Sequence, residues 1–369
     1  MLEAIKKNII NIPGKTINNK IVVFESDDWG SIRIPNKQVY NDLLNKNLIT
    51  LNDPFSTFDC LENDEDLDLL FNVLSKFKDI NGNSPIFTGN TVVGNPDFKK
   101  IKENSFSCYY NENFIDTYKN HANCENAFNI TSKAIEEKLF FPQFHAKEHL
   151  NVSQWLGLLK NNDINFKYAF DLNCFAIDYK SIDNRRANLM ATYDYHSDNE
   201  LNEINKSIKE GLKYFESIFK MHSRTTIAPC YVWDSKIESI FLENNVFCFQ
   251  GSRFQNVPLP NTNNFKKIFH YNGDKNKNKQ TYLSRNALFE PSLNQNIDWV
   301  DKCMESISIA FKWGKPAVIG THRINFMGSL VRENRENGLK KLDKLLKAIT
   351  SKWPEVQFKT SEELFDIVK

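Results

Sequence analysis

The sequence lacks the features of membrane-spanning, disulfide-bonded and nucleic-acid-binding proteins. No stretch of the 369 residues approaches the roughly 18 consecutive apolar residues of a membrane-spanning helix. The seven Cys residues are odd in number and include no C-x-x-C pair, so buried reduced thiols are a simpler interpretation than a disulfide framework or a Cys-rich zinc knuckle. Lys plus Arg (47) nearly equals Asp plus Glu (46), so no overall field would recruit nucleic acid or an anionic membrane.

The first residues, "MLEAIKKNIINIPGK", show no long apolar segment and no small-residue cleavage pattern of a secretion signal. We therefore expect a cytoplasmic protein without a membrane span or a nucleic-acid partner. Its oligomeric state stays open. The share of hydrophobic residues (41%) and the 29 Phe residues indicate a packed globular chain.

Short β-branched and aromatic runs alternate with helical patterns, which predicts an α/β fold with a parallel sheet or barrel. The expected strands are 21–25, 85–89, 139–145, 166–171, 225–230, 246–251 and 317–322. The expected helices include residues 64–78 and 336–349, whose Leu and Phe residues recur at helical spacing. The chain end predicts one more short strand and then a helix opened by a capping box from Thr360 to Glu363.

We find no internal repeat and no domain linker, so we expect a single domain over residues 1–369. Residues 260–280 are polar and low in complexity, which predicts an exposed loop or insertion near 255–280.

Three short segments carry residues suited to metal-assisted hydrolysis. "SDDWG" places Asp27 and Asp28 at the end of an apolar strand, and "AVIGTH" ends a later strand in His322. Active sites of α/β barrels assemble at the carboxyl ends of the strands. Because neighbouring strand residues point to opposite faces, a turn at this tip could give the two aspartates different roles.

The segment "HAKEH" provides two histidines, His145 and His149. If a helix begins near His145, both imidazoles lie on one face about 6 Å apart and could share a metal ion. Alone, such a pair is as often two surface histidines. An aspartate from another strand would give three N/O ligands with open positions, as in catalytic zinc sites.

Taken in order, "ESDDWG", "HAKEH", "IAPCYVWD" and "IGTHR" resemble the successive motifs of the polysaccharide deacetylase family, of the NodB-homology or carbohydrate esterase 4 type. This resemblance implies a deformed (β/α) barrel of the NodB or glycoside hydrolase–deacetylase type. It also implies removal of N- or O-linked acetyl groups from a sugar or glycan with a divalent metal, usually Zn²⁺.

The resemblance assigns roles to five residues. Asp27 corresponds to the general base, and Asp28, His145 and His149 correspond to the metal ligands. His322 corresponds to the general acid.

Further residues are candidates for substrate contacts. Trp29 and Tyr231 could stack on sugar rings, and Asn90 and Arg323 could add polar contacts. Ordinary core packing is the competing interpretation of the aromatic residues, and a plain loop is the competing interpretation of the segment that holds Asn90. The resemblance also implies that backbone N–H groups near Tyr231 could hold the oxyanion.

Two departures from the family pattern concern the partners of the base and of the acid. The family's arginine that pairs with the base aspartate is replaced by Ile227, and Arg224, Arg253 or Arg323 could substitute for it. The Asp-x-x-Asp-Trp motif that orients the catalytic histidine has no clear counterpart, although "FQGSRFQ" occupies about the same place.

Three other functions compete with deacetylation. "HAKEH" also fits H-x-x-E-H, the signature of a group of zinc peptidases with Glu148 as the base. Two histidines and one carboxylate could hold iron(II) for oxygenase chemistry. A catalytically inactive, glycan-binding barrel would account for the missing arginine. The peptidase interpretation leaves Asp27, Asp28 and His322 unexplained, so we rank it second.

Overall fold

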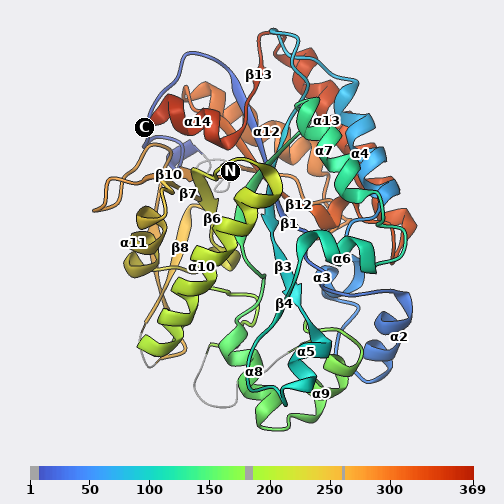
Figure 1. Cartoon of the computed structure of the whole chain (residues 1–369). Coiled ribbons are helices and arrows are strands. Elements are labelled where there is room, and N and C mark those ends of the chain that lie inside the picture. Colours follow the sequence, from blue (N-terminus) through green and yellow to red (C-terminus); the bar gives the residue numbers. More distant parts are fainter. Residues whose placement is uncertain (1–7, 179–185, 260–261) are drawn as a thin grey trace.

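The computed structural model describes residues 8–178, 186–259 and 262–369. Its centre is a sheet of parallel strands in the order β11-β12-β1-β2-β5, with β13 also paired to β1 (Figure 1). Every residue of β1 is buried, as expected for a parallel strand covered on both faces. The strands of this sheet are β1 (Ile21–Trp29), β2 (Phe87–Val92), β5 (Phe140–Ala146), β11 (Ala287–Leu288), β12 (Ala317–His322) and β13 (Gln357–Phe358).

A second parallel sheet joins the first through one continuous segment, residues 281–288. This sheet contains β6 (Thr225–Ile227), β7 (Cys248–Gly251) and β10 (Thr281–Ser284). β10 pairs with β7, and three residues later β11 pairs with β12. The segment therefore closes one side of a barrel.

On the other side, side chains bridge β5 and β6. The Thr226 hydroxyl donates to the carbonyl oxygen of Phe144 at 2.8 Å, and the N–H of Phe144 donates to the Ser223 hydroxyl at 2.9 Å. The two sheets thus form an open, deformed barrel of parallel strands. This architecture agrees with the α/β class and the deformed barrel expected from the sequence.

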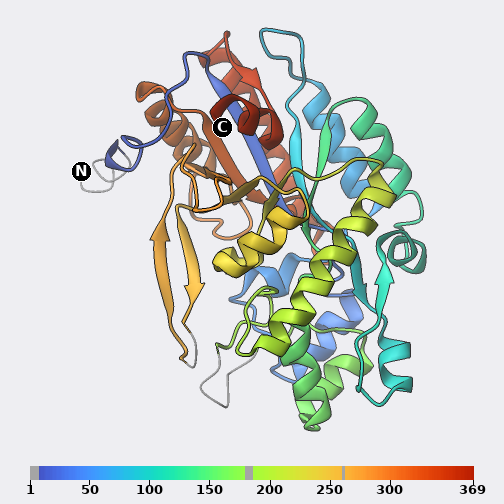
Figure 2. The same cartoon turned by 60° about the vertical axis from the view of Figure 1, so that its left-hand side comes forward.

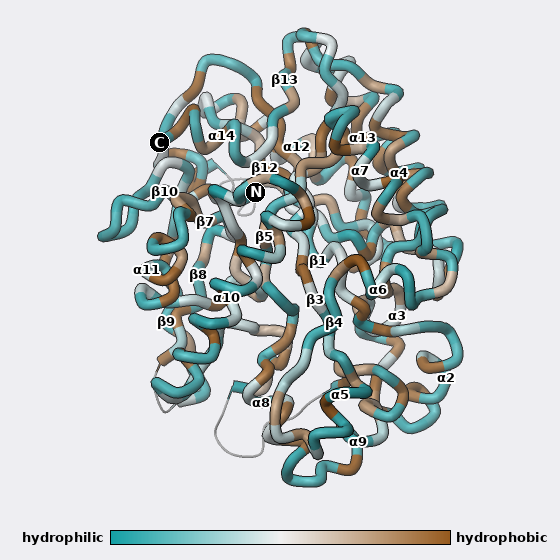
Figure 3. Tube along the Cα trace, in the orientation of Figure 1, coloured by the Kyte–Doolittle hydropathy of each residue, from teal (hydrophilic) through white to brown (hydrophobic). Residues whose placement is uncertain are grey.

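Helices cover the outside of the strands. α4, α7 and α13 lie on one flank of the central strands in Figure 1, and α10 and α11 lie on the opposite flank. Apolar and polar residues alternate along these helices (Figure 3), which is typical of helices with one face on a core. The bounds are α2 (Lys37–Asn45), α3 (Pro54–Phe58), α4 (Asp64–Ser75), α5 (Phe98–Glu103), α6 (Phe114–Asn120), α7 (Ala127–Glu136), α8 (Val152–Lys160), α9 (Ile164–Asp171), α10 (Asp198–Phe219), α11 (Ser235–Glu243), α12 (Trp299–Lys312), α13 (Arg332–Lys352) and α14 (Ser361–Val368), with 3₁₀ turns η1 (Pro229–Tyr231) and η2 (Arg323–Phe326). None of the described helices combines the length and apolar character that crossing a bilayer requires.

Most predicted elements are present, and one is wrong. A strand overlaps each of six expected ranges, namely 21–25, 85–89, 139–145, 225–230, 246–251 and 317–322. The expected capping box between Thr360 and Glu363 is also formed. Residues 166–171 belong to helix α9 instead of a strand. There the helical spacing of the buried residues Phe166, Ala169 and Phe170, together with the N-cap at Asp163, outweighs the aromatic composition.

The polar region near 255–280 contains a β-hairpin. β8 (Phe254–Pro258) and β9 (Phe265–Phe269) pair antiparallel and stand beside the barrel, as the two orange strands of Figure 2 show. Residues 270–280 then run as turns and an isolated bridge into β10. The loop or insertion expected near 255–280 thus begins with a β-hairpin, in which apolar residues pair at the two ends, Phe254 with Phe269 and Pro258 with Phe265.

Another small ribbon, formed by β3 (Gly94–Pro96) and β4 (Asn111–Asn113), follows β2. It supports the loop after β1 through Asn95. The side chain of Asn95 accepts from the N–H of Ile32 at 3.0 Å and donates to the carbonyl oxygen of Gly30 at 2.8 Å.

Helix α13 packs closely against the turn that follows β12. A Cβ atom added to Gly338 would lie 1.7 Å from the backbone oxygen of Asn325 in η2. Only glycine permits this approach. Gly157, in α8, has no atom within 4 Å of the same position.

We expect Gly338→Ala to destabilise the fold by about 1–3 kcal/mol or more, because the new methyl group cannot avoid the backbone of η2. Gly157→Ala is the matched control and should be neutral, or stabilising by up to about 1 kcal/mol. Thermal unfolding of both variants beside the wild type tests this. A Gly338→Ala protein as stable as the wild type would contradict the described packing of α13.

Candidate functional site

The strand register brings the candidate residues together at the carboxyl ends of the strands. Asp27 lies opposite His322 in the β1–β12 pair. Asn90 of β2 lies opposite Gln143 of β5, two residues before His145. Residues far apart in the sequence therefore meet at one edge of the sheet.

A backbone irregularity at the end of β1 separates the two aspartates. The pairing of β1 with β2 shifts register between Ser26 and Trp29, and Asp28 has a φ of 77°, in the left-handed region. Aspartate tolerates this conformation better than most residues. Gly30 follows with a φ of 83°, where a Cβ atom would lie 2.6 Å from the Phe114 ring. The bulge lets Asp27 and Asp28 each contribute to the same pocket with different partners.

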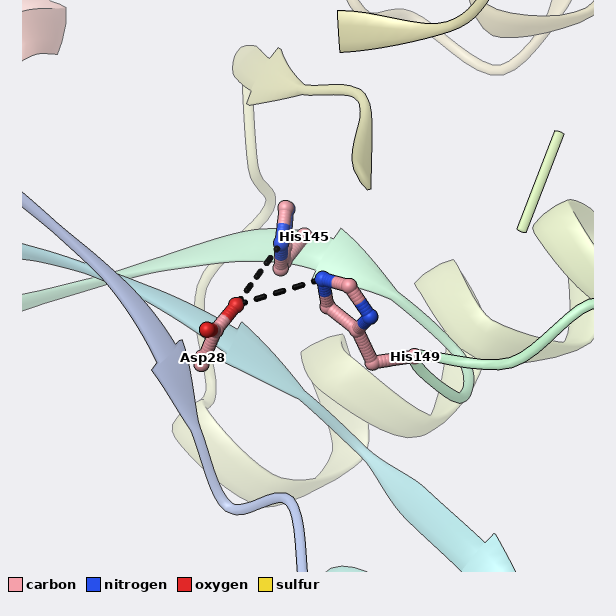
Figure 4. Close-up of side chains that lie close together, drawn as sticks. All are labelled: Asp28, His145 and His149. Carbon is pink, nitrogen blue, oxygen red and sulfur yellow. Dashed lines mark ion pairs between the residues drawn. The ribbon is translucent and has the colours of Figure 1, made fainter. Parts of the chain in front are cut away.

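Asp28, His145 and His149 form a cluster suited to a metal ion (Figure 4). Oδ1 of Asp28 lies 3.6 Å from Nε2 of His145 and 3.2 Å from Nε2 of His149, and the ligand atoms all lie within 4.8 Å of one another. Ligand atoms around a tetrahedral zinc ion, with bonds of about 2.0–2.1 Å, lie about 3.3 Å apart. The donor set and its spacing therefore fit a divalent ion such as zinc.

The hydrogen bond of His145 fixes its tautomer. Its Nδ1 lies 2.7 Å from the backbone oxygen of Ile227, which can only accept a hydrogen bond. In the neutral ring, Nδ1 therefore carries the proton, and the lone pair of Nε2 faces Asp28.

The condition considered from the sequence, a helix that begins near His145, is not met. His145 belongs to strand β5 and His149 to the bend before α8, whose N-cap is Asn151. The expected proximity nevertheless exists, since the two ring centroids lie 5.1 Å apart. Nδ1 of His149 is buried and has no hydrogen-bond partner among the described residues.

Asp27 is held by an arginine that the sequence analysis missed. Arg285 donates from Nη1 to Oδ2 and from Nη2 to Oδ1 of Asp27, both at 2.6 Å, and from Nε to Glu25 at 2.8 Å. Asn90 donates to Oδ1 of Asp27 at 2.6 Å. Burial raises the pKa of Asp27, but the Arg285 guanidinium outweighs burial and holds it below its usual value.

The three arginines considered from the sequence have other partners. Arg224 pairs with Glu362 and Asp366, and Arg253 donates to the backbone of Ile10. Arg323 is fully buried against Asp59 and Glu62 and does not line the pocket, so we do not retain it as a substrate contact.

His322 is held by Glu290, which the sequence analysis also missed. Nδ1 of His322 lies 2.7 Å from Oε1 of Glu290, and its Nε2 lies 3.5 Å from Oδ2 of Asp27. Asn325 donates to the other oxygen of Glu290 at 2.8 Å. Burial lowers the pKa of His322, but Glu290 and the two aspartates outweigh burial and raise it to about 10.

The expected counterpart "FQGSRFQ" does not supply this orienting group. Its Gln250 instead bonds to Gln143 inside the barrel. Arg285 and Glu290 both lie on the stretch "SRNALFEP", on either side of the short apolar run "ALF", whose first two residues form β11. Charged residues beside an apolar run were the available signal, but they do not reveal the partners.

The aromatic and amide candidates have mixed outcomes. Trp29 is buried, packs edge-on against Phe140 and donates to the Ser26 hydroxyl, so it belongs to the core. Asn90 is fully buried and contacts Asp27. Tyr231 lines the pocket.

Tyr231 offers its hydroxyl to the pocket rather than its backbone N–H. Its N–H donates to the carbonyl oxygen of Ala228 at 3.0 Å. Its phenol oxygen accepts from Arg285 at 3.0 Å, and because a guanidinium cannot accept, the phenol proton points elsewhere.

The pocket has a volume of about 240 Å³. This lies below the roughly 300–1,000 Å³ of sites for drug-sized ligands, so its occupant is a small group. Several of the residues that line the pocket were not among the candidates from the sequence. Its lining residues are Asp27, Asp28, Arg33, Phe55, His145, His149, Asn188, Met190, Ile227, Ala228, Cys230, Tyr231 and His322.

Glu148 of the "HAKEH" segment does not line this pocket. Its Oε1 accepts from the Ser207 hydroxyl at 3.0 Å, and its side chain lines a separate cavity beside α10. A peptidase of the H-x-x-E-H type needs this carboxylate next to the metal. The placement of Glu148 therefore disfavours the peptidase interpretation.

The sequence matches no family model and no curated protein. Solved structures do match the fold. A proposed polysaccharide deacetylase from Mycobacterium smegmatis is 8% identical with a TM-score of 0.46, and the match covers 96% of this chain and 94% of that one. A proposed polysaccharide deacetylase from Pseudomonas aeruginosa PAO1 is 8% identical with a TM-score of 0.48, covering 94% and 89%.

A 4-alpha-glucanotransferase from Thermococcus litoralis is 9% identical with a TM-score of 0.47, covering 95% of this chain. The chain spans only 40% of the length of that protein. Polysaccharide deacetylases are thus among the structural matches. At these identities the argument about function rests on the site itself.

We expect Arg285→Met to destabilise the protein by about 3–5 kcal/mol at neutral pH, because Glu25 and Asp27 would stay buried without a counter-charge. The pKa of Glu25, which burial already raises, would rise further, and the pKa of Asp27 would rise from below its usual value to above it. The folded state would then bind more protons than the unfolded state, so stability would be lost as the pH rises above about 4. Urea unfolding at pH 5 and pH 7.5 should show the larger loss at pH 7.5.

The matched control is the double variant Arg285→Met/Glu25→Gln, which should recover part of the lost stability because one buried charge is removed. Equal losses at both pH values for the single variant would argue against the buried ion group.

We expect Glu290→Gln to lower the pKa of His322 by about 1–3 units, because the substitution removes the closest carboxylate while keeping the side-chain shape. Histidine resonances in NMR spectra of the metal-free protein, followed across pH, measure this pKa directly. His322→Gln provides the assignment. An unchanged titration of His322 in the variant would refute the role of Glu290.

Proposed function

We propose that this protein is a metal-dependent hydrolase that removes N- or O-linked acetyl groups from a carbohydrate. One observation carries the proposal. A single small pocket combines a three-ligand Asp-His-His cluster, an arginine-paired aspartate and a glutamate-paired histidine. These are the groups that hydrolysis of an acetamide or an acetyl ester requires.

Asp28, His145 and His149 would hold the ion. Zinc or another divalent ion bound there would polarise the acetyl carbonyl and lower the pKa of water from 15.7 towards roughly 7. Three protein ligands leave at least one position open, which is typical of catalytic rather than structural zinc sites.

Asp27 is the candidate base. Arg285 and Asn90 occupy three of the roughly four lone-pair directions of its carboxylate. The remaining direction belongs to Oδ2, on the side that faces His322. Oδ2 would therefore accept the proton of the attacking water. Because Arg285 keeps the pKa of Asp27 low, the carboxylate stays ionised across the neutral range.

His322 is the candidate acid. Its raised pKa keeps the ring protonated at neutral pH, and Nε2 would donate its proton to the leaving nitrogen or oxygen of the sugar. A divalent ion nearby would lower this pKa towards neutrality, because like charges repel. The phenol proton of Tyr231 could bind the carbonyl oxygen or a sugar hydroxyl from a third side.

We expect Asp28→Ala and His149→Ala each to lose the bound metal and at least about 100-fold in the rate of acetate release, because each removes a metal ligand. The measurements are metal content per chain and acetate release from a panel of N- and O-acetylated sugars. His222→Ala is the matched control, because it removes a partly buried imidazole that contacts the carbonyl oxygen of Asn245 and does not line the pocket.

One metal ion per wild-type chain, lost together with activity in both variants but kept in His222→Ala, supports the proposal. A well-folded wild type without any metal would overturn it and would favour the inactive, glycan-binding barrel.

A further inference from the structure

The wall of the pocket carries a cation that the proposed chemistry does not use, the side chain of Arg33. It lines the same pocket as Asp27, Asp28 and His322. Its side chain is only 17% exposed, and its Nε has no hydrogen-bond partner among the described residues. Because this Nε is shielded from solvent, a ligand in the pocket would meet the terminal Nη groups of the same guanidinium.

The neighbouring acid only partly satisfies Arg33. Oδ2 of Asp59 lies 3.7 Å from Nε of Arg33, too far for a hydrogen bond. The other oxygen of Asp59 accepts from Nε of Arg323 at 3.1 Å. Asp59 thus interacts with two arginines, and its interaction with Arg33 is the weaker of the two.

The position of Arg33 is fixed by its backbone and by an aromatic ring. Arg33 has a φ of 37° and forms an antiparallel bridge with Cys60. Its guanidinium lies 4.9 Å from the centroid of the Phe55 ring, and the same ring meets His322 edge-on at 5.3 Å. Phe55 therefore places the guanidinium and the candidate acid on the same wall of the pocket.

We propose that Arg33 binds an anionic group of the substrate, so that the protein acts on an acetylated acidic sugar. This inference rests on the proposed function. A guanidinium matches the two oxygens of a carboxylate or a phosphate with two parallel N–H donors. Because the pocket holds only about 240 Å³, the anionic group and the acetyl group belong to the same sugar unit or to adjacent units.

The test is the binding of glucose, glucuronate and glucose 6-phosphate to the metal-loaded protein, measured by calorimetry. We expect at least one anionic probe to bind more tightly than glucose. Arg33→Met should weaken the binding of that probe by about tenfold to a hundredfold, because charge-assisted hydrogen bonds are lost. If Arg33→Met weakens the binding of glucuronate, the anionic group is a carboxylate. If it weakens the binding of glucose 6-phosphate, the group is a phosphate.

Two further variants control this experiment. Arg33→Lys keeps the charge but loses the planar fork, so an intermediate loss is expected, and this variant also serves if Arg33→Met does not fold. Arg332→Met removes an exposed arginine of α13 and should bind all three probes as the wild type does. Metal content is measured in every variant, because the ion itself can bind anions.

Anion binding that is unchanged in Arg33→Met and Arg33→Lys would overturn the inference, and so would equal affinity of the wild type for all three probes. Acetate release is assayed separately with acetylated glucosides and glucuronosides. A wild type that binds anions through Arg33 but releases no acetate would refute the proposed function and leave the assignment of Arg33 as an anion site intact.

Discussion

The site depends on one buried ion group, in which the Arg285 guanidinium lies between the carboxylates of Glu25 and Asp27. Glu25 and Asp27 are two residues apart on β1, so both point to the same face of the strand, into the barrel. Burying either carboxylate alone would be prohibitive. With Arg285 in place the pKa of Asp27 lies below its usual value, although burial still raises the pKa of Glu25, and Arg285 lies on the segment that joins the two sheets. The segment that closes the barrel therefore also supplies the cation that keeps the candidate base ionised.

The residues that directly follow this segment position the candidate acid. Arg285 holds Asp27, and five residues later Glu290 holds His322. Since Asp27 and His322 lie side by side in the strand register, the two partners approach neighbouring targets from one piece of chain. Asn325 braces Glu290 from the turn against which α13 packs, so the orientation of His322 is linked to the helical layer.

The sequence was sufficient for the residues that end strands and insufficient for the residues that support them. Asp27, Asp28, His145, His149 and His322 could be singled out as candidates because each stands beside an apolar run or in a short motif. Arg285 and Glu290 could not, because their partners lie 258 and 32 residues away and only tertiary packing brings them together. The strand expected at 166–171 is wrong for a local reason, since spacing and aromatic content fit more than one element over so few residues. The positive φ of Asp28 likewise arises from the bulge, and the residue types around Asp28 do not predict it.

The long separation between β1 and Arg285 also has a consequence for biosynthesis. The ribosome releases Glu25 and Asp27 about 260 residues before their counter-charge. Until residues 281–288 pack against β1, burial of β1 would leave two carboxylates without a counter-charge in an apolar core. We therefore expect this central strand to stay accessible to solvent during most of translation. The metal ligands, in contrast, are all present once residue 149 has emerged. A nascent or truncated chain that ends before residue 281 would thus keep its central strand unpacked, and such a chain is a natural client for chaperones and a substrate for proteases.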